Sequence, residues 1–234
     1  MLKDFLSFDK RNRWFDHKVK GQPAVKDTIE SLGVPHTEVG FIVINNRPSR
    51  FFAQLGDGDR IAVYPDLPQR NQYPGGGLKE KPSKNPKFIL DSHLGKLARH
   101  LRLLGFDVIY KRDFPDEEII RLVKKANRIV LTRDIGLLKN KLISCGYWVR
   151  SIDAAKQIKE VLKRYELIQK IRPFSRCLEC NGKIKKVAKK KVLPLLPPKV
   201  QRYYDKFYRC DDCRKIYWQG SHYEQLAQLV AKFR

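Results

Sequence analysis

Residues 88–105 read FILDSHLGKLARHLRLLG, and their apolar pattern establishes the architecture of the middle of the chain. The first three residues form a short apolar run that is typical of a buried strand. From Leu94 onward, leucines and Ala98 recur at helical spacing, and this periodicity stops at Gly105. The stretch therefore predicts a strand followed directly by an amphipathic helix.

The same alternation continues toward the C-terminus. Short β-branched and aromatic runs predict further strands at residues 106–110, 128–132 and 147–149. Apolar residues at helical spacing predict helices at residues 116–126 and 158–165. Strands that alternate with helices favour a parallel sheet covered by helices on both faces. We therefore predict an α/β fold for this part of the chain.

The chain is strongly basic. It has 49 Lys and Arg residues against 25 Asp and Glu residues, which gives a formal net charge of +24 and a pI of about 9.9. The balance is +2 for residues 1–80, +12 for residues 81–172 and +10 for residues 173–234. Such a field attracts polyanions, of which nucleic acid is the commonest inside a cell. We therefore expect a nucleic acid as the partner.

The sequence lacks the features of membrane and secreted proteins. No basic amphipathic helix, apolar anchor or run of about 20 apolar residues is found. The first residues hold no apolar core of a signal peptide. Five cysteines in 234 residues do not resemble a disulfide scaffold. We therefore expect a cytoplasmic protein with no membrane partner.

Proline and glycine mark one boundary in the chain. Residues 64–87 contain five prolines and the run Gly75–Gly77, and no apolar periodicity survives there. A weaker boundary lies near Pro173, just before the first cysteine pair. Together they predict an N-terminal module at residues 1–70, a linker at 71–86, the alternating domain at 87–172 and a cysteine module at 173–234.

Acidic residues cluster after the predicted strands. Asp91 follows the first strand directly, and Asp134 follows the strand at 128–132 after one residue. The loop and helix start after the second strand carry Asp113, Asp116, Glu117 and Glu118. Because ligands of open parallel sheets bind at the carboxyl ends of the strands, we expect these carboxylates at one edge. An Mg²⁺ or Mn²⁺ ion would relieve their repulsion, bind phosphate and activate water.

Each acidic position also has a simpler interpretation. The acidic residues from Asp116 to Glu118 suit a helix start after Pro115, because the helix dipole favours negative charge there. Asp91 can cap the following helix, and Asp134 can belong to an ordinary turn. The joint placement of the three positions in a segment with a net charge of +12 favours the metal-site interpretation.

Basic side chains flank the acidic edge. We predict that six of them contact RNA phosphates, namely Lys96, Arg99, Arg102, Arg133, Lys139 and Lys141. The first three occupy the polar side of the helix predicted after Leu94, with His100 nearby. Phosphate contacts of this kind position RNA without reading its sequence. The alternative is an ordinary solvated helix surface.

Two cysteine pairs form the strongest motif in the sequence. The pairs are Cys177 with Cys180 and Cys210 with Cys213, and 29 residues separate them. Two such turns complete a closed, tetrahedral, structural zinc site that leaves no open position for catalysis. Thioredoxin-like redox chemistry is the alternative for a single pair. Cys145 is left over and is expected to be a buried small hydrophobe.

Basic and aromatic residues are interleaved within the cysteine module. Residues 183–191 are rich in lysine, and Tyr203, Tyr204, Phe207, Tyr208, Tyr217, Trp218 and Tyr223 follow. This combination suits single-stranded or looped RNA, whose bases can stack on aromatic rings. The alternative for many of these rings is the core of the module itself. A surface role is expected for His222, since four cysteines already complete the zinc site.

The N-terminal module reads as a β-grasp. We predict strands at residues 14–19, 40–44 and 61–64, a helix at 24–32, and a turn at 56–59. This order is similar to ubiquitin-like sulfur carriers, which act through a terminal Gly-Gly carboxylate. Here Gly75–Gly77 is internal, so carrier chemistry is not expected. We interpret the N-terminal segment as a docking or accessory module, with a protein as the candidate partner.

Several of these stretches resemble the Mut-seven C-terminal ribonuclease domain family, a PIN-like group. The matching stretches are residues 88–105, Asp116–Ile120 and Ile129–Asp134. The cysteine module, including YWQGSH at 217–222, is similar to the zinc ribbon that follows the domain in this family. Residues 1–70 resemble the ubiquitin-like module that often precedes it.

The resemblance implies a PIN-like fold and RNA cleavage that depends on Mg²⁺ or Mn²⁺. It assigns the catalytic acidic positions to Asp91, Asp116 and Asp134, with Glu117 or Asp113 in support. PIN nucleases usually carry another acidic residue on the helix between the first and third positions, and the helix ending at Gly105 has none. The competing hypothesis is a non-catalytic RNA- or ribosome-binding protein that retains the fold.

Overall fold

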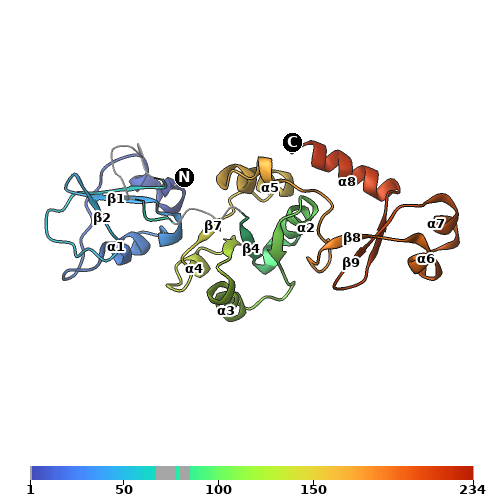
Figure 1. Ribbon diagram of the computed structural model, residues 1–234. Helices are drawn as coiled ribbons and strands as arrows, with labels where there is room; N and C mark the ends of the chain where they lie inside the picture. The colour runs from blue at the N-terminus through green and yellow to red at the C-terminus, as the bar shows by residue number, and fades with distance from the viewer. Residues whose placement is uncertain (1, 67–76, 80–84, 234) are drawn as a thin grey trace. The chain divides into compact units, whose positions relative to one another are not determined.

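The computed structural model describes residues 2–66, 77–79 and 85–233 (Figure 1). The chain forms two compact units, of which the first comprises residues 1–82 and 116–148. The second comprises residues 83–115 and 149–234. The linker predicted at residues 71–86 lies mostly outside the described residues.

A small α/β structure begins the first unit. Its helix α1 spans Val25–Ser31, and its antiparallel sheet has the strand order β2-β1-β3. The strands are β1 (Phe41–Ile44), β2 (Arg47–Ser49) and β3 (Ile61–Tyr64). These bounds confirm the predicted helix at 24–32 and the predicted strands at 40–44 and 61–64.

A two-residue turn joins β1 to β2. Its residues Asn45 and Asn46 have φ values of 49° and 62°, and the turn sets Ile44 opposite Arg47. Asparagine tolerates this left-handed conformation, which matches the twist of the two strands. The Asn45 side chain also donates to Asp59 at 2.6 Å, so the hairpin is tied to the loop before β3.

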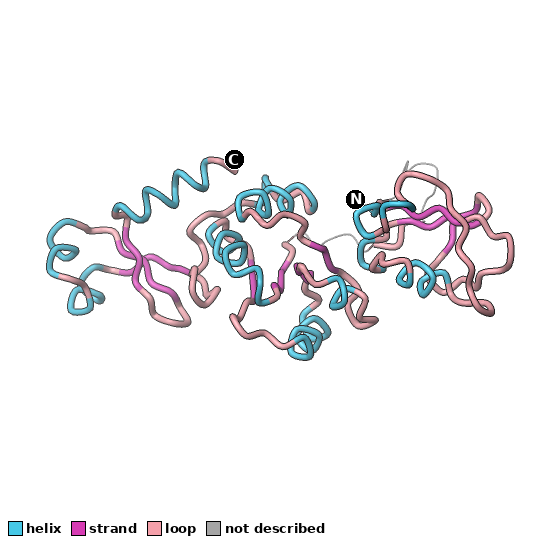
Figure 2. The backbone as a smooth tube through the Cα atoms, turned by 180° about the vertical axis from the view of Figure 1, so that it is seen from behind, coloured by secondary structure: helices cyan, strands magenta, loops and turns pink. Residues whose placement is uncertain are grey.

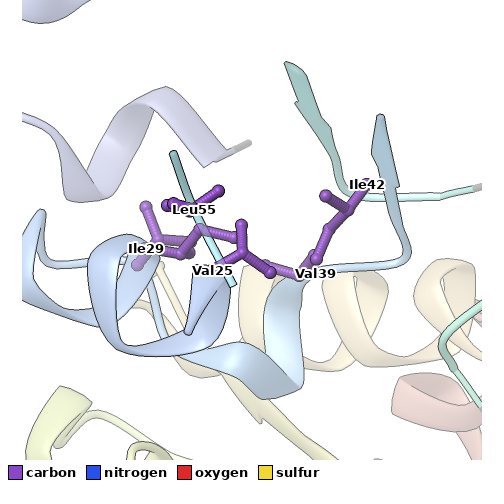
Figure 3. Close-up of a cluster of buried hydrophobic side chains, with 6 residues drawn as sticks. Val25, Ile29, Val39, Ile42 and Leu55 are labelled. Carbon is purple, nitrogen blue, oxygen red and sulfur yellow. The ribbon is translucent and has the colours of Figure 1, made fainter. Parts of the chain in front are cut away.

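An apolar cluster holds this structure together (Figure 3). Val25 and Ile29 lie one turn apart on α1, so they present one face to Val39, Ile42 and Leu55. All five side chains are buried. Burial of each stabilises the fold by about 1.5–3 kcal/mol.

The strand predicted at residues 14–19 is wrong. These residues have no regular secondary structure, and Trp14 and Val19 are 67% and 40% exposed. The guanidinium of Arg60 lies 5.2 Å from the centre of the Trp14 ring. The indole thus meets a cation at the surface instead of a core, which explains why its apolar character misled the prediction.

A four-stranded parallel sheet has the strand order β5-β4-β6-β7. Figure 2 draws the strands in magenta and the helices in cyan. Its strands are β4 (Lys87–Leu90), β5 (Asp107–Ile109), β6 (Ile129–Thr132) and β7 (Gly146–Trp148). The β4–β5 pair belongs to the second compact unit and the β6–β7 pair to the first. This sheet and its helices confirm the predicted α/β fold.

Two helices accompany β4 and β5 in the second unit. They are α2 (Gly95–Leu103) and α5 (Ala154–Arg164), which contact each other. Gly105, with φ +94°, follows α2, and the N–H of Phe106 donates to the carbonyl of Leu101 at 3.0 Å. This is a Schellman cap, in which a residue in the left-handed conformation ends the helix.

Two helices accompany β6 and β7 in the first unit. They are α3 (Asp116–Ala126) and α4 (Ile135–Leu138), and α4 contacts both strands. Ile119 and Val123 form the buried face of α3. The predicted helix at residues 116–126 is thereby confirmed with its bounds.

The cysteine module has its own antiparallel sheet, with the strand order β10-β9-β8. Its elements are β8 (Ile184–Val187), α6 (Lys189–Val192), α7 (Pro198–Tyr203), β9 (Phe207–Cys210), β10 (Ile216–Trp218) and α8 (Ser221–Ala231). Val192, Leu196 and Phe207 form its buried apolar cluster. Several of the predicted aromatic rings thus build this core.

Short 3-10 turns complete the described structure. They are η1 (Leu2–Phe5), η2 (Phe8–Lys10), η3 (His36–Glu38), η4 (Ser92–Leu94), η5 (Ile168–Lys170) and η6 (Leu193–Leu195). Across the described ranges, every helix is too short or too polar to cross a membrane.

Candidate functional site

Asp91 lies directly after the last residue of β4. Its side chain is 5% exposed, and its Oδ1 atom accepts a hydrogen bond from the N–H of His93 at 2.8 Å. This contact makes Asp91 the N-cap of η4. The capping interpretation is therefore correct for one carboxylate oxygen, and a cap can also serve as a metal ligand.

Asp134 follows β6 after one residue and has a similar local geometry. Its exposed carboxylate accepts from the N–H of Gly136 at 2.7 Å and caps α4. Its own N–H donates to the hydroxyl of Thr132 at 2.8 Å. Both ends of this short turn are thus fixed by side chains, which orients the carboxylate.

The remaining acidic candidates lie at the start of α3. Asp116 and Glu117 are exposed in its first turn, and Asp113 is exposed in the preceding loop. Within either compact unit, no three described carboxylates come close enough to share a metal ion. The catalytic roles of Asp91, Asp116, Asp134 and Glu117 stay predictions.

The basic candidates on α2 divide into two kinds. Lys96 and Arg99 are exposed, and Arg99 lies 3.5 Å from the carboxylate of Glu179. Arg102 is only 5% exposed, and its guanidinium donates to the carbonyls of Val108, Leu178 and Glu179 at 3.1, 3.1 and 2.7 Å. Its Nε and Nη1 atoms therefore hold the first cysteine turn against α2 and β5.

The three basic candidates around α4 also differ. The ammonium of Lys139 donates to the carbonyl of Glu30 at 2.7 Å, at the C-terminal end of α1. Arg133 is half-buried, and its carbonyl accepts from the Trp148 indole at 3.1 Å. Lys141 is exposed. The prediction that these residues contact RNA stays a prediction.

The four predicted zinc ligands come together in the structure. The sulfurs of Cys177 and Cys213 are 3.6 Å apart, those of Cys180 and Cys210 are 3.4 Å apart, and all four lie within 4.8 Å of one another. In a tetrahedral zinc site with Zn–S bonds of about 2.3 Å, the sulfurs are about 3.8 Å apart. The cluster can therefore hold a zinc ion.

The local backbone explains how each cysteine turn closes. The residues after Cys180 and Cys213 are Asn181 and Arg214, which have φ values of 72° and 63°. This left-handed step reverses the chain, and the N–H of Asn181 then donates to the Cys177 carbonyl at 3.0 Å. At Gly182 a Cβ atom would lie 2.7 Å from the Cys210 sulfur, so only glycine fits there.

The thiols differ in their affinity for protons. Burial raises the pKa of the Cys177 thiol, but hydrogen bonds from the N–H of Cys180, the hydroxyl of Tyr217 and the N–H of Glu179 outweigh it, and the pKa falls to about 7. Burial raises the pKa of Cys213 to about 12. Since zinc binds thiolates, metal binding releases protons and strengthens as the pH rises.

Tyr217 and Arg102 support the cysteine cluster, and the sequence did not reveal either role. Burial raises the pKa of the Tyr217 hydroxyl, so it stays protonated and donates to the Cys177 sulfur at 3.0 Å. Four thiolates around a bound Zn²⁺ would carry a net charge of −2, and the Arg102 guanidinium beside the first turn would offset one unit of it. Only the place of Tyr217 next to the second cysteine pair hints at its role.

Fold and site together define a class of protein: a parallel α/β domain followed by a module whose four cysteines can hold a metal ion. Residues 86–230 match the family described as Mut7-C RNAse domain, and residues 1–70 match Mut7-C ubiquitin. Because the first match spans more than half of the chain, the protein belongs to the Mut7-C RNAse domain family. Comparison with curated proteins and with solved structures finds no match.

Proposed function

We propose that the protein is a metal-dependent endoribonuclease that cleaves RNA phosphodiester bonds. The observation that carries this proposal is the match of residues 86–230 to a ribonuclease domain family. Acidic residues that follow β4 directly and β6 after one residue support it, because parallel sheets bind ligands at the carboxyl ends of their strands.

In this proposal Asp91, Asp116 and Asp134 supply oxygen ligands, and Glu117 assists. Carboxylate oxygens are the donors that Mg²⁺ and Mn²⁺ prefer, and such an ion activates water and stabilises the leaving oxygen. The protein's own contribution is orientation, since the caps at His93 and Gly136 hold Asp91 and Asp134 in fixed conformations. Hydrolysis adds one water across a P–O bond and yields two RNA fragments.

Positive charge supports RNA as the substrate. Residues 81–172 carry a net charge of +12, and Lys96, Arg99 and Lys141 are exposed within them. Arg133 and Lys139 are the remaining candidates near Asp134, with tRNA and rRNA among the candidate substrates. We also propose that zinc in the cysteine cluster is structural, that the N-terminal module docks a protein partner, and that the protein is cytoplasmic.

A cleavage assay tests the proposed activity. Single-stranded and structured RNA are incubated with the zinc-loaded chain in Mg²⁺, in Mn²⁺ and with neither ion. A strong chelator is avoided because it would also strip the cysteine cluster. We expect ion-dependent cleavage by the wild type and loss of cleavage in Asp134→Asn and Asp91→Asn.

These substitutions are suitable because asparagine is as good an N-cap as aspartate. Each variant therefore keeps its cap while losing the charge. Asp57→Asn, in the exposed turn before β3, is the matched control and should cleave like the wild type. If the wild type cleaves neither RNA with either ion, or if Asp134→Asn cleaves as fast as Asp57→Asn, the nuclease proposal fails.

The second candidate is a non-catalytic RNA- or ribosome-binding protein. One observation favours it: α2, which ends before Gly105, carries no acidic residue. This candidate predicts RNA binding that weakens with salt, together with no cleavage in any of the conditions above.

A further inference from the structure

A large groove opens on the cysteine module and on α2, all within the second compact unit. Its volume is about 1040 Å³, the size of a small-molecule binding site. Seven aromatic side chains line it: Phe174, Tyr203, Tyr204, Tyr208, Tyr217, Trp218 and Tyr223. Tyr204 and Trp218 also pack against the small core of the module, whose buried residues are Val192, Leu196 and Phe207, so the other five rings exceed what that core uses.

The sheet presents part of this lining as an ordered row. Lys186 on β8 lies opposite Tyr208 on β9, which lies opposite Tyr217 on β10. Residues directly opposite one another point to the same face of a sheet, so the three side chains share one face. Phe207, on the other face, packs into the core with Val192. The row therefore faces the groove with one cation beside two rings.

The charge of the groove is positive. Five of its lining residues are basic and one is acidic, namely Glu179. That carboxylate lies 3.0 Å from the ammonium of Lys215 and 3.5 Å from Arg99, so its charge is compensated. Lys186 and Lys199 are exposed and have no ion pair within the part of the chain that the structure describes. Both are available to an anionic ligand.

The start of α8 adds backbone donors. Gly220, Ser221 and His222 line the groove, and no side chain caps this helix. Uncapped N–H groups and the positive end of the helix dipole favour a phosphate group. Together with the lysines, they place anion-binding groups beside stacking surfaces.

We propose that this groove binds single-stranded RNA. Unpaired bases stack on Tyr203 and Tyr208, while Lys186 and Lys199 contact the phosphates. Stacking requires bases that are free of a duplex, which selects single strands and loops. Tyr203 is 69% exposed and so accepts a base without rearrangement of the core. The inference rests on the RNA-directed function proposed above and names the form of RNA that is held.

Equilibrium binding of a labelled oligouridine to the zinc-loaded full chain tests the groove. Mg²⁺ and Mn²⁺ are omitted so that binding is measured without cleavage. We expect Tyr203→Ala to weaken binding by roughly tenfold with little change in salt dependence, because it removes a stacking surface. The double variant Lys186→Gln/Lys199→Gln should weaken binding and lower the slope of log K against log salt by about 1.4, or about 0.7 per lost phosphate contact.

Matched controls remove the same groups elsewhere. Lys190→Gln/Lys191→Gln removes two exposed charges from α6, and Phe52→Ala removes a ring that is 79% exposed in the N-terminal module. Both controls should bind nearly as the wild type does. The proposal is overturned if the groove variants bind like their controls, or if an RNA duplex binds as tightly as the single strand.

Two further outcomes separate this proposal from the others. If polyglutamate displaces oligouridine as well as unlabelled oligouridine does, the groove is a site for acidic protein segments and the RNA proposal fails. If the groove variants lose binding but the wild type never cleaves RNA, the groove stands and the nuclease proposal fails. If the wild type cleaves RNA while the groove variants and controls bind alike, the nuclease proposal stands and the groove fails.

Discussion

The Nε2 atom of His36 lies 2.9 Å from the carbonyl oxygen of Ile143, a residue 107 positions further along the chain. The other ring nitrogen lies 2.6 Å from the carboxylate of Glu30. Nearby, a carboxylate oxygen of Glu38 accepts from the N–H of Trp148 at 2.7 Å, and the Trp148 ring lies 5.0 Å from that of Phe5. The N-terminal module is therefore joined to the β6–β7 region by buried polar contacts.

This joint predicts a specific loss of stability. His36→Ala leaves the Ile143 carbonyl without the ring nitrogen and removes the ring contact to the Glu30 carboxylate, which should destabilise the first unit by about 1–3 kcal/mol. His17→Ala, at an exposed position, is the matched control. Urea unfolding followed by tryptophan fluorescence measures the difference. Equal midpoints for the two variants would contradict the proposed joint.

The cysteine cluster predicts one zinc ion per chain. Cys213→Ser should reduce the zinc content sharply and abolish the ordered aromatic signal of the cysteine module, because the metal supplies much of its folding free energy. Cys145→Ser should keep the full zinc content, since Cys145 is outside the cluster. Metal analysis and near-ultraviolet circular dichroism check both variants. Full zinc content in Cys213→Ser would rule out the four-cysteine site.

Arg102 is predicted to hold the first cysteine turn. Arg102→Gln loses a buried cation and contacts to the carbonyls of Leu178 and Glu179, and should destabilise the second unit by about 2–3 kcal/mol. Zinc should also transfer faster to a chelator. Arg99→Gln is the control, because Arg99 is exposed and makes one long contact to Glu179. If Arg102→Gln releases zinc at the same rate as Arg99→Gln, Arg102 does not hold the cysteine turn.

Gly105 is predicted to tolerate no side chain. Its φ is +94°, and an added Cβ would lie 2.1 Å from the carbonyl oxygen of Arg172, which is backbone and cannot move aside easily. Gly58 also has a positive φ, of +76°, but open space around it. Gly58→Ala should therefore cost only the left-handed strain of roughly 1–2 kcal/mol. In thermal unfolding, Gly105→Ala should have a much lower melting temperature than Gly58→Ala. The reverse order would refute the packing argument.

His100 predicts a pH dependence of stability. Burial, with Arg99 and Lys96 nearby, lowers the pKa of its imidazole from the ordinary 6.5, and the buried Nδ1 atom has no hydrogen-bond partner among the described residues. Below pH 6.5 the His100 imidazole is protonated more in the unfolded state than in the folded state. Acidification therefore lowers the free energy of unfolding. The free energy of unfolding should fall as the pH drops from 6.5 toward the folded pKa, and less so in His100→Asn. If the free energy of unfolding depends on pH in the same way in the wild type and in His100→Asn, His100 is not the source of the pH dependence.

Local signals explain which elements could be predicted. The bounds of α3 follow from Pro115, the acidic first turn and the apolar period of the helix, all of which lie within a dozen residues. Strand β2 was missed because Arg47–Ser49 has little strand character and forms only through the two-asparagine turn. Trp14 misled the prediction because sequence cannot tell a ring stacked on a cation from one in a core.

The candidate site, too, could be predicted only where the signals are local in the sequence. Cysteine spacing alone predicted the metal cluster, because each turn is closed by its own residues. The burial of Arg102 could not be predicted, since its partners Leu178 and Glu179 lie 76 and 77 residues away. The groove likewise needs α2 and the cysteine module together, so its lining could be suspected only as a list of basic and aromatic residues.

Neither compact unit is a continuous stretch of chain, and this governs the order of folding during synthesis. The first unit cannot close until residue 148 has left the ribosome, and the second must wait for the residues that carry the cysteines. Residues 83–115 therefore emerge long before α5 can cover them. Because contacts between distant residues form slowly, each unit waits for its second segment, and the four cysteines can meet only after Cys213 has been synthesised.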